Sequence, residues 1–189
     1  MAPSMEWEHL RLEFYKLTVT SFIQKGQTGT IIPNVFSAAS DFQSGFKSIS
    51  MGKSGVVGLK DDNTVYCIGD NKVITKNLIF IWKYGTCGLG HSNGVMKITQ
   101  ISNMVNITQV SAGDYHTLLL AVDGQVYSFG QGGSGKLGHG NAFNQNTPKA
   151  ISGFNDIISA SAGYYHSIIL RNDSTAWCKI FEFVIESYF

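Results

Sequence analysis

Short apolar runs, separated by turns that contain glycine, follow one another through the second half of the chain. Residues 157–162 and 165–171 flank a Gly-Tyr turn, and residues 110–112 and 115–121 flank a Gly-Asp turn in the same way. Apolar runs of this length, bounded by turn residues and without helical periodicity, are typical of β-strands. The pattern therefore predicts pairs of antiparallel strands.

Each of these pairs continues into further strand-like segments. Asp123-Gly124 forms a two-residue turn signal and leads into residues 125–129, whose Val, Tyr and Phe content suits a buried strand. A glycine-dense loop follows at residues 131–140. Residues 148–151 then predict a short edge strand with a proline at its first position, where the missing N–H does least harm. One unit is thus predicted to be a four-stranded antiparallel sheet.

The unit is repeated. The phrase Ala-Gly-Asp-Tyr-His-Thr-Leu-Leu-Leu at residues 112–120 returns as Ala-Gly-Tyr-Tyr-His-Ser-Ile-Ile-Leu at residues 162–170, a spacing of 50 residues. A worn third copy at residues 46–52 matches residues 107–113 at a spacing of 61, and Gly55 occupies its histidine position. A period of this size predicts stacked structural units, and four-stranded sheets at this period are typical of propeller blades.

Two further segments follow in the same order: Asp-Gly-Gln-Val-Tyr-Ser-Phe-Gly at residues 123–130 and Gly-Lys-Leu-Gly-His-Gly at residues 135–140. Together with the repeated phrase, they resemble the repeats of the regulator of chromosome condensation family. The resemblance covers residues 46–70 and 85–178. Members of this family fold as seven-bladed β-propellers. The resemblance therefore implies an all-β fold of four-stranded antiparallel blades, here an incomplete ring of about two to three blades.

The register of the repeat divides the chain into segments. We expect an unassigned segment at 1–45, propeller repeats at 46–178 and a tail outside the repeat at 179–189; the repeats comprise a degenerate blade part at 46–70, an insertion at 71–84, and blades at 85–130 and 131–178. The losses of register near 71–84 and 179–189 lead to the hypothesis that the chain is a fragment or carries retained non-coding stretches. Sequencing the messenger RNA would test this hypothesis.

Composition narrows the choice of partner and compartment. Charged residues make up 14% of the chain and the net charge is +1, with no basic run, so nucleic-acid binding has no support. The longest apolar stretch, residues 77–82, is too short for a membrane helix, and residues 1–10 show no secretory signal. We expect an intracellular protein, with the cytoplasm and the nucleus both left open, and no membrane partner.

Three cysteines, Cys67, Cys87 and Cys178, show no CxxC spacing. Their odd number and irregular spacing indicate neither a disulfide framework nor a zinc site. Acidic or cysteine ligands at metal spacing are also missing around the histidines, so we expect no metal and no cofactor.

Two motifs invite a catalytic or nucleotide-binding interpretation. His116 and His166 begin apolar runs at equivalent positions of two units, which favours a scaffold role over an active site. Residues 130–135 satisfy GxGxxG, but Leu-Gly-His-Gly-Asn follows at 137–141 and cannot readily begin the helix that such a loop requires. We therefore predict no catalytic residues, and we interpret as structural repeat positions Gly52, Gly113, His116, Asp123, Gly130, Gly138, Gly163, His166 and Asp173.

The sequence predicts a non-enzymatic module that binds a protein through blade-connecting loops, with residues 131–146 and 85–94 as the candidate surfaces. The alternative implied by the resemblance is a guanine-nucleotide exchange regulator of a small GTPase. Because an incomplete ring leaves strands unpaired, we also expect self-association through open blade edges.

Overall fold

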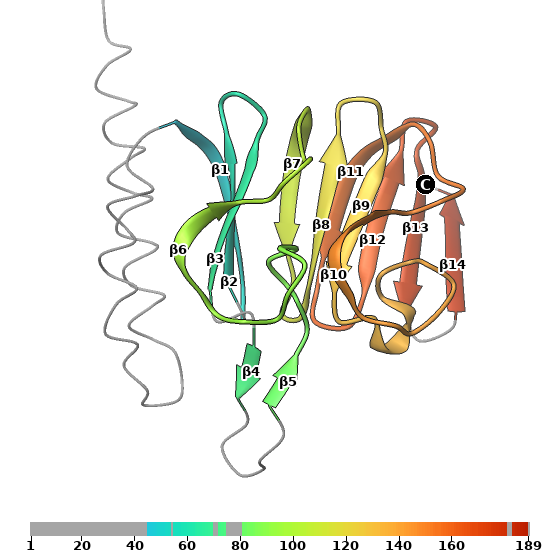
Figure 1. The fold of residues 1–189 in the computed structure, drawn as a ribbon. Helices are drawn as coiled ribbons and strands as arrows, with labels where there is room; N and C mark the ends of the chain where they lie inside the picture. Colours follow the sequence, from blue (N-terminus) through green and yellow to red (C-terminus); the bar gives the residue numbers. More distant parts are fainter. Residues whose placement is uncertain (1–44, 54, 70–71, 75–80, 181–182, 189) are drawn as a thin grey trace, which may run out of the picture. The chain divides into compact units, whose positions relative to one another are not determined.

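The computed structural model describes residues 45–53, 55–69, 72–74, 81–180 and 183–188. The chain divides into two compact units, Met1–Ser44 and Gly45–Phe189, and the description below concerns the second. Its strands form three four-stranded antiparallel sheets within the described residues, and they do not close into a ring (Figure 1). The all-β fold and the incomplete propeller predicted from the sequence are therefore confirmed.

The three sheets share one plan, in which consecutive strands pair as hairpins. The first sheet has the order β1-β2-β3-β6, with strands β1 (Phe46–Gly52), β2 (Gly55–Lys60), β3 (Val65–Gly69) and β6 (Val95–Gln100). The second has the order β7-β8-β9-β10, with strands β7 (Ile107–Ala112), β8 (His116–Ala121), β9 (Val126–Gly130) and β10 (Gln145–Ala150). The third has the order β11-β12-β13-β14, with strands β11 (Ile157–Ala162), β12 (Ser167–Arg171), β13 (Thr175–Ile180) and β14 (Phe183–Tyr188).

The expected segments and the sheets differ in phase. The sheets span residues 46–100, 107–150 and 157–188, whereas the sequence repeat predicts blades that begin at residues 85 and 131. A periodic sequence has no intrinsic starting point, so its units can be cut at the glycine loop or at the first strand. The expected insertion contains a two-stranded hairpin of β4 (Lys72–Ile74) and β5 (Ile81–Lys83), and the expected tail supplies β14.

Strand β10 departs from one detail of the sequence prediction. It is an edge strand, as expected, but it begins at Gln145, so Pro148 lies inside it rather than at its start. The register of β10 against β9 shifts between Gln145 and Lys149. Proline is tolerated at this position because the irregularity replaces regular ladder pairing around it.

The core lies between the faces of neighbouring sheets. Val57, Leu59 and Phe129 belong to a cluster that fills the space between the first and second sheets. Leu118 and Ile169 belong to a second cluster between the second and third sheets. Strand β8 has a sheet on both sides, and all six of its residues are buried. The sheets therefore stack face to face, as blades do in a propeller.

Candidate functional site

The repeated Ala-Gly-x-x-His phrase forms the turn between the first two strands of a sheet. A Cβ added to Gly113 would lie 3.0 Å from His116 Cε1, and one added to Gly163 would lie 2.4 Å from His166 Nε2. Each histidine ring therefore lies against the glycine three residues before it. The glycine and the histidine of the phrase are needed together because the ring occupies the space that a larger residue would fill.

The same glycines form a close contact between sheets. A Cβ on Gly52 would lie 1.9 Å from the carbonyl oxygen of Gly113, and a Cβ on Gly113 would lie 2.3 Å from that of Gly163. Nearby, Ser50 Oγ accepts a hydrogen bond from Ala112 N at 2.8 Å. The column of Gly52, Gly113 and Gly163 thus allows the backbones of three sheets to approach.

His116 joins the second sheet to the third. Its Nε2 lies 2.8 Å from Ser167 Oγ, and this hydroxyl donates to the Lys136 carbonyl at 2.7 Å. Because the serine proton is used in that way, Nε2 carries the imidazole proton and donates to the serine. Burial, with smaller contributions from Lys136 and His166, lowers the pKa of His116 to about 3. His116 is therefore buried and neutral at pH 7, and it links two sheets.

The first sheet has Gly55 at the corresponding position, and a cavity of about 10 Å³ lies there, lined by Gly55, Val57, Cys67, Thr86, Ala112, Gly113 and Thr117. Thr117 Oγ1 donates to Thr86 O at 3.0 Å, which repeats the bond from Ser167 to Lys136 O one sheet earlier. The cavity therefore occupies the place of the missing histidine ring. A volume of this size suits a water molecule and is far below the roughly 300 Å³ of a small-molecule site.

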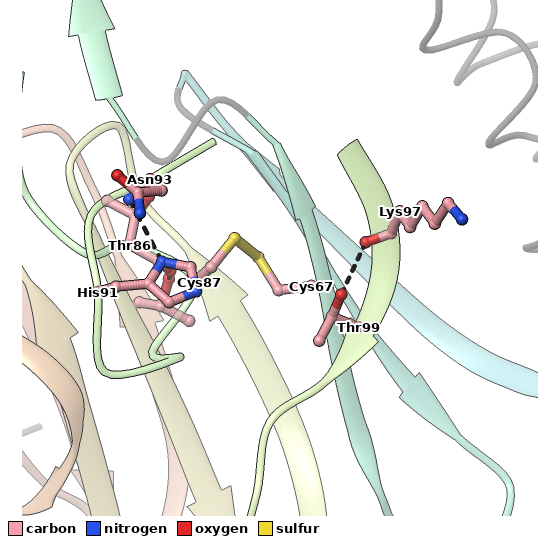
Figure 2. The surroundings of a disulfide bond; sticks show 8 residues. Cys67, Thr86, Cys87, His91, Asn93, Lys97 and Thr99 are labelled. Atoms are coloured by element: carbon pink, nitrogen blue, oxygen red, sulfur yellow. Dashed lines mark hydrogen bonds between the residues drawn. A yellow bond between two sulfur atoms is a disulfide. The ribbon is translucent and has the colours of Figure 1, made fainter. Parts of the chain in front are cut away.

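Cys67 and Cys87 form a disulfide between β3 and the loop after β5, with their Cα atoms 5.4 Å apart (Figure 2). The sequence prediction of no disulfide framework is wrong at this point. Cysteine spacing does not show that the end of β3 and this loop lie side by side. In the second sheet the corresponding residues are Ser128 and Leu137, and Ser128 Oγ donates to the Leu137 carbonyl at 2.7 Å. The disulfide of the first sheet thus lies where the second sheet has this hydrogen bond.

The remaining repeat positions are the turn residues Asp123 and Asp173, Gly130 at the end of β9, and Gly138 in the loop after η1. Asp123 Oδ1 accepts from Gln125 N at 3.0 Å, and Asp173 Oδ1 accepts from Thr175 N at 2.9 Å. Asp173 Oδ1 also accepts a hydrogen bond from the Thr175 hydroxyl. The bonds from the hydroxyl and the backbone N–H of Thr175 lower the pKa of the Asp173 carboxyl. Gly130 and Gly138 both have positive φ, 109° and 76°, which glycine adopts without strain.

The glycine-dense loop lacks the geometry of a phosphate-binding loop. Its helical part is a 3₁₀-helix of three residues, η1 (Gly133–Gly135), where a phosphate loop requires a longer helix that begins at the loop. Lys136, which would approach phosphates in that motif, is buried and donates to Gln131 Oε1. His139 Nε2 lies 2.9 Å from Ser128 Oγ, so this loop histidine also contacts the blade.

The described part of the chain contains no group of three or more His, Cys, Asp and Glu side chains that could hold a metal ion. Among the same residues, no helix is long and apolar enough to cross a membrane.

Four tyrosines and two lysines gather at the end of the sheets that carries the first strand turns; we call this set the tyrosine–lysine surface, and it consists of Lys53, Tyr84, Tyr115, Lys136, Tyr164 and Tyr165. Tyr115 lies at its centre and contacts Tyr84 and Tyr164 edge to face, with ring centroids 5.7 and 5.1 Å apart. The hydroxyls of Tyr115 and Tyr164 are 2.9 Å apart. These contacts hold the exposed rings in place.

The exposure of the tyrosine–lysine surface is graded. Tyr115 is buried, whereas Tyr164 and Tyr165 are 41% and 47% exposed. Lys53 is exposed, and its Nζ lies 3.4 Å from the Tyr115 hydroxyl. Lys136 lies beneath, 5.1 Å from the centroid of Tyr165, and burial lowers its pKa to about 8. The exposed part of this surface therefore combines the fixed rings of Tyr164 and Tyr165 with the ammonium group of Lys53, which suits contact with another macromolecule.

The two candidate loops meet near this surface. Gly90 N donates to Asn146 O at 2.8 Å, which joins residues 85–94 to residues 131–146. Phe143 in the second loop is 75% exposed. The sequence prediction missed the tyrosines because they belong to turns of different units. One sequence signal points to this surface. The residue directly after the turn glycine differs among the three units, which carry Lys53, Asp114 and Tyr164 there.

Comparison with known proteins identifies the repeat. Residues 123–170 match one description of the regulator of chromosome condensation (RCC1) repeat, and residues 46–73 and 107–136 match a second. The E3 ubiquitin-protein ligase HERC2 of Homo sapiens is 31% identical over an alignment of 138 residues, which covers 68% of this chain and 3% of HERC2. The X-linked retinitis pigmentosa GTPase regulator homolog of Caenorhabditis elegans is 30% identical over 94 residues, or 48% of this chain and 7% of that protein.

A solved structure agrees in fold. The structure of Prp20p from Saccharomyces cerevisiae, reported with its binding properties toward Gsp1p and histones, superposes with a TM-score of 0.58 at 24% identity. The match covers 70% of this chain and 32% of Prp20p. The chain thus spans a small part of the relatives that it matches. It carries repeats of the regulator of chromosome condensation family, folded as blades of a partial β-propeller.

Proposed function

We propose that this chain is a non-enzymatic protein-binding module and that it contacts its partner through the tyrosine–lysine surface. The observation that carries the proposal is the exposure of Tyr164 and Tyr165, which are held by ring contacts to the buried Tyr115. Fixed, half-exposed tyrosines lose little side-chain entropy on binding. Aromatic residues of this kind dominate the energy of many protein interfaces.

The position of the surface also supports binding. Its residues come from the turns after β1, β7 and β11 and from the loops that follow β5 and β9. These segments connect the strands and leave the sheet pairing intact if their side chains change. Propellers and other β-scaffolds carry their binding residues on such connections.

Site-directed cross-linking tests this proposal. A photoreactive amino acid in place of Tyr165 is expected to form a covalent adduct with a protein partner in the cells that produce the chain. Val122 is the matched control, because it is 70% exposed and lies in the turn at the opposite end of β8. Adducts from position 122 with none from position 165 would contradict the proposal.

A regulator of a small GTPase is the second candidate function, favoured by the similarity to a relative named a GTPase regulator homolog. A nucleotide-release assay with candidate small GTPases separates the two. A binding module leaves release at its background rate. Acceleration of release by the purified chain would establish the regulator and replace the simpler proposal.

A further inference from the structure

The face of the third sheet that turns away from the second sheet is apolar and uncovered among the described residues. Residues alternate along β12, so Ser167 and Ile169 are buried against the second sheet while Ile168 is 40% exposed. Leu118 holds the position of Ile168 in the second sheet, and it is 1% exposed because the third sheet covers it.

The interface between the second and third sheets shows what such a face accepts. On the second sheet, Leu118, Leu120 and Val126 pack into a cluster with residues of β11 and β12. Counting forward 50 residues, the open face of the third sheet carries Ile168, Leu170 and Ala176. The open face thus repeats the apolar set that is covered by a sheet elsewhere in the same molecule.

The polar contacts of this interface recur as well. Gln109 Oε1 and Ser111 Oγ accept hydrogen bonds from the backbone N–H groups of Ala160 and Ala162, both at 2.9 Å. Ser159 and Ser161 hold the corresponding positions in the third sheet. The open face therefore provides hydroxyl acceptors for the first strand of another sheet, in addition to apolar contacts.

The first sheet carries the complementary half of the interface. Val57 and Leu59 point into the cluster against the second sheet, so Val56 lies on the opposite face, and it is half-buried. In the repeat register Val56 corresponds to Thr117 and Ser167, the residues with which the second and third sheets contact the sheet before them. The first sheet thus carries an apolar residue at the position with which the other two sheets contact the sheet before them, and Gly58 stands where they carry Leu119 and Ile169.

We propose that two copies of this chain associate head to tail, with the open face of the third sheet of one copy packed on the first sheet of the other. The contact is between sheet faces, in the same arrangement as the two sheet–sheet interfaces within the chain. A heterologous contact closes into a ring or continues as a chain of copies. Two copies would bring six sheets together, within the range of four to eight that closes a propeller.

Sedimentation velocity of the full chain over a wide range of concentration tests the proposal. A species of twice the 20.6 kDa monomer mass is expected to grow with concentration. Ile168→Asp and Val56→Asp each place a carboxylate in the contact, and each variant alone is expected to remain a monomer. Ile158→Asp is the matched control, because Ile158 is 58% exposed and its counterpart Thr108 is exposed even in the covered second sheet.

Mixing the two variants distinguishes a head-to-tail contact from any other. Ile168→Asp keeps an intact first-sheet face and Val56→Asp keeps an intact third-sheet face, so an equimolar mixture is expected to form heterodimers. Circular dichroism and thermal unfolding show whether each variant is folded. A folded pair that stays monomeric when mixed, or a Val56→Asp variant that still dimerises alone, would overturn the proposal.

The unmodified chain decides the question even if a variant unfolds. A constant mass of 20.6 kDa at every concentration would overturn the proposal without reference to any substitution.

Discussion

The glycine and the histidine of the repeated phrase depend on each other for space. The glycine leaves room for the histidine ring of its own sheet and for the backbone of the next sheet. The histidine then donates to Ser167 of that next sheet. The Nε2 atom of His116 is thus used in a contact between sheets, and the ring is buried, which favours a scaffold role over a catalytic one.

Gly113→Ala is expected to destabilise the fold. The new methyl group would lie 2.3 Å from the Gly163 carbonyl oxygen, and this contact involves backbone that cannot move freely. Overpacking of this kind typically costs about 1–3 kcal/mol, which urea unfolding measures. Gly133→Ala is the control, because its methyl group would meet only side-chain atoms of Gln131 at 3.9 Å. Equal losses in the two variants would contradict the account of the glycine column.

His116 is expected to make stability depend on pH. Its pKa is about 3 in the folded chain and near 6.5 when unfolded, so the unfolded state binds the proton more readily between these values. Its contribution is complete above about pH 6.5 and falls by about 1.4 kcal/mol per pH unit as the pH drops toward 3. Urea unfolding near pH 7 and near pH 5 should therefore show a smaller difference for His116→Gln than for the native chain. The same difference in both proteins would exclude this role.

At the scale of the element, the loops that contain Thr86 and Lys136 are each hydrogen-bonded to a strand of the next sheet. Thr117 Oγ1 bonds to Thr86 O, and Ser167 Oγ bonds to Lys136 O, across the same number of residues. A second contact links the third strand to the glycine loop in the first and second sheets: the Cys67–Cys87 disulfide in the first and a hydrogen bond from Ser128 in the second. These contacts position the loops that form the tyrosine–lysine surface.

Loss of the disulfide is expected to lower the free energy of unfolding. It closes a loop of 20 residues, and restricting such a loop in the unfolded chain is worth about 3 kcal/mol. Cys67→Ala with Cys87→Ala should lose most of this amount. Cys67→Ser with Cys87→Leu copies Ser128 and Leu137 and should lose less. Chemical unfolding with and without reductant measures both, and native stability that is unchanged by reductant would contradict the prediction.

Strand positions could be predicted from the sequence because they depend on local alternation and on turn residues. The predicted strand over residues 157–162 agrees with β11 (Ile157–Ala162), and the Asp123-Gly124 turn separates β8 from β9. The disulfide could not be predicted, because it depends on which loop lies beside β3. The start of β10 before Pro148 was also missed, since the register shift that accommodates the proline leaves no local signal.

At the scale of the whole molecule, stacking turns local repeats into two kinds of surface. The open face of the third sheet repeats the residues of the sheet–sheet interface. The turns at the ends of the strands instead carry residues that differ among the units. Lys53, Asp114 and Tyr164 occupy one repeat position and lie on adjacent turns. The sequence shows that this position varies, but it does not show that turns from three sheets bring the residues of the tyrosine–lysine surface together. The repeat thus holds the fold, and its variable positions are available for recognition.

The affinity of a double variant for the partner captured at position 165 tests this account most directly. Tyr164→Ala with Tyr165→Ala removes both exposed rings and leaves the buried Tyr115 in place. Calorimetric titration should show binding weakened roughly 30-fold or more, the effect of losing about 2 kcal/mol at an interface centre. Val122→Ala, at the other end of the sheet, should bind as the native chain does. Native affinity in the folded double variant would contradict the central claim that this surface binds the partner.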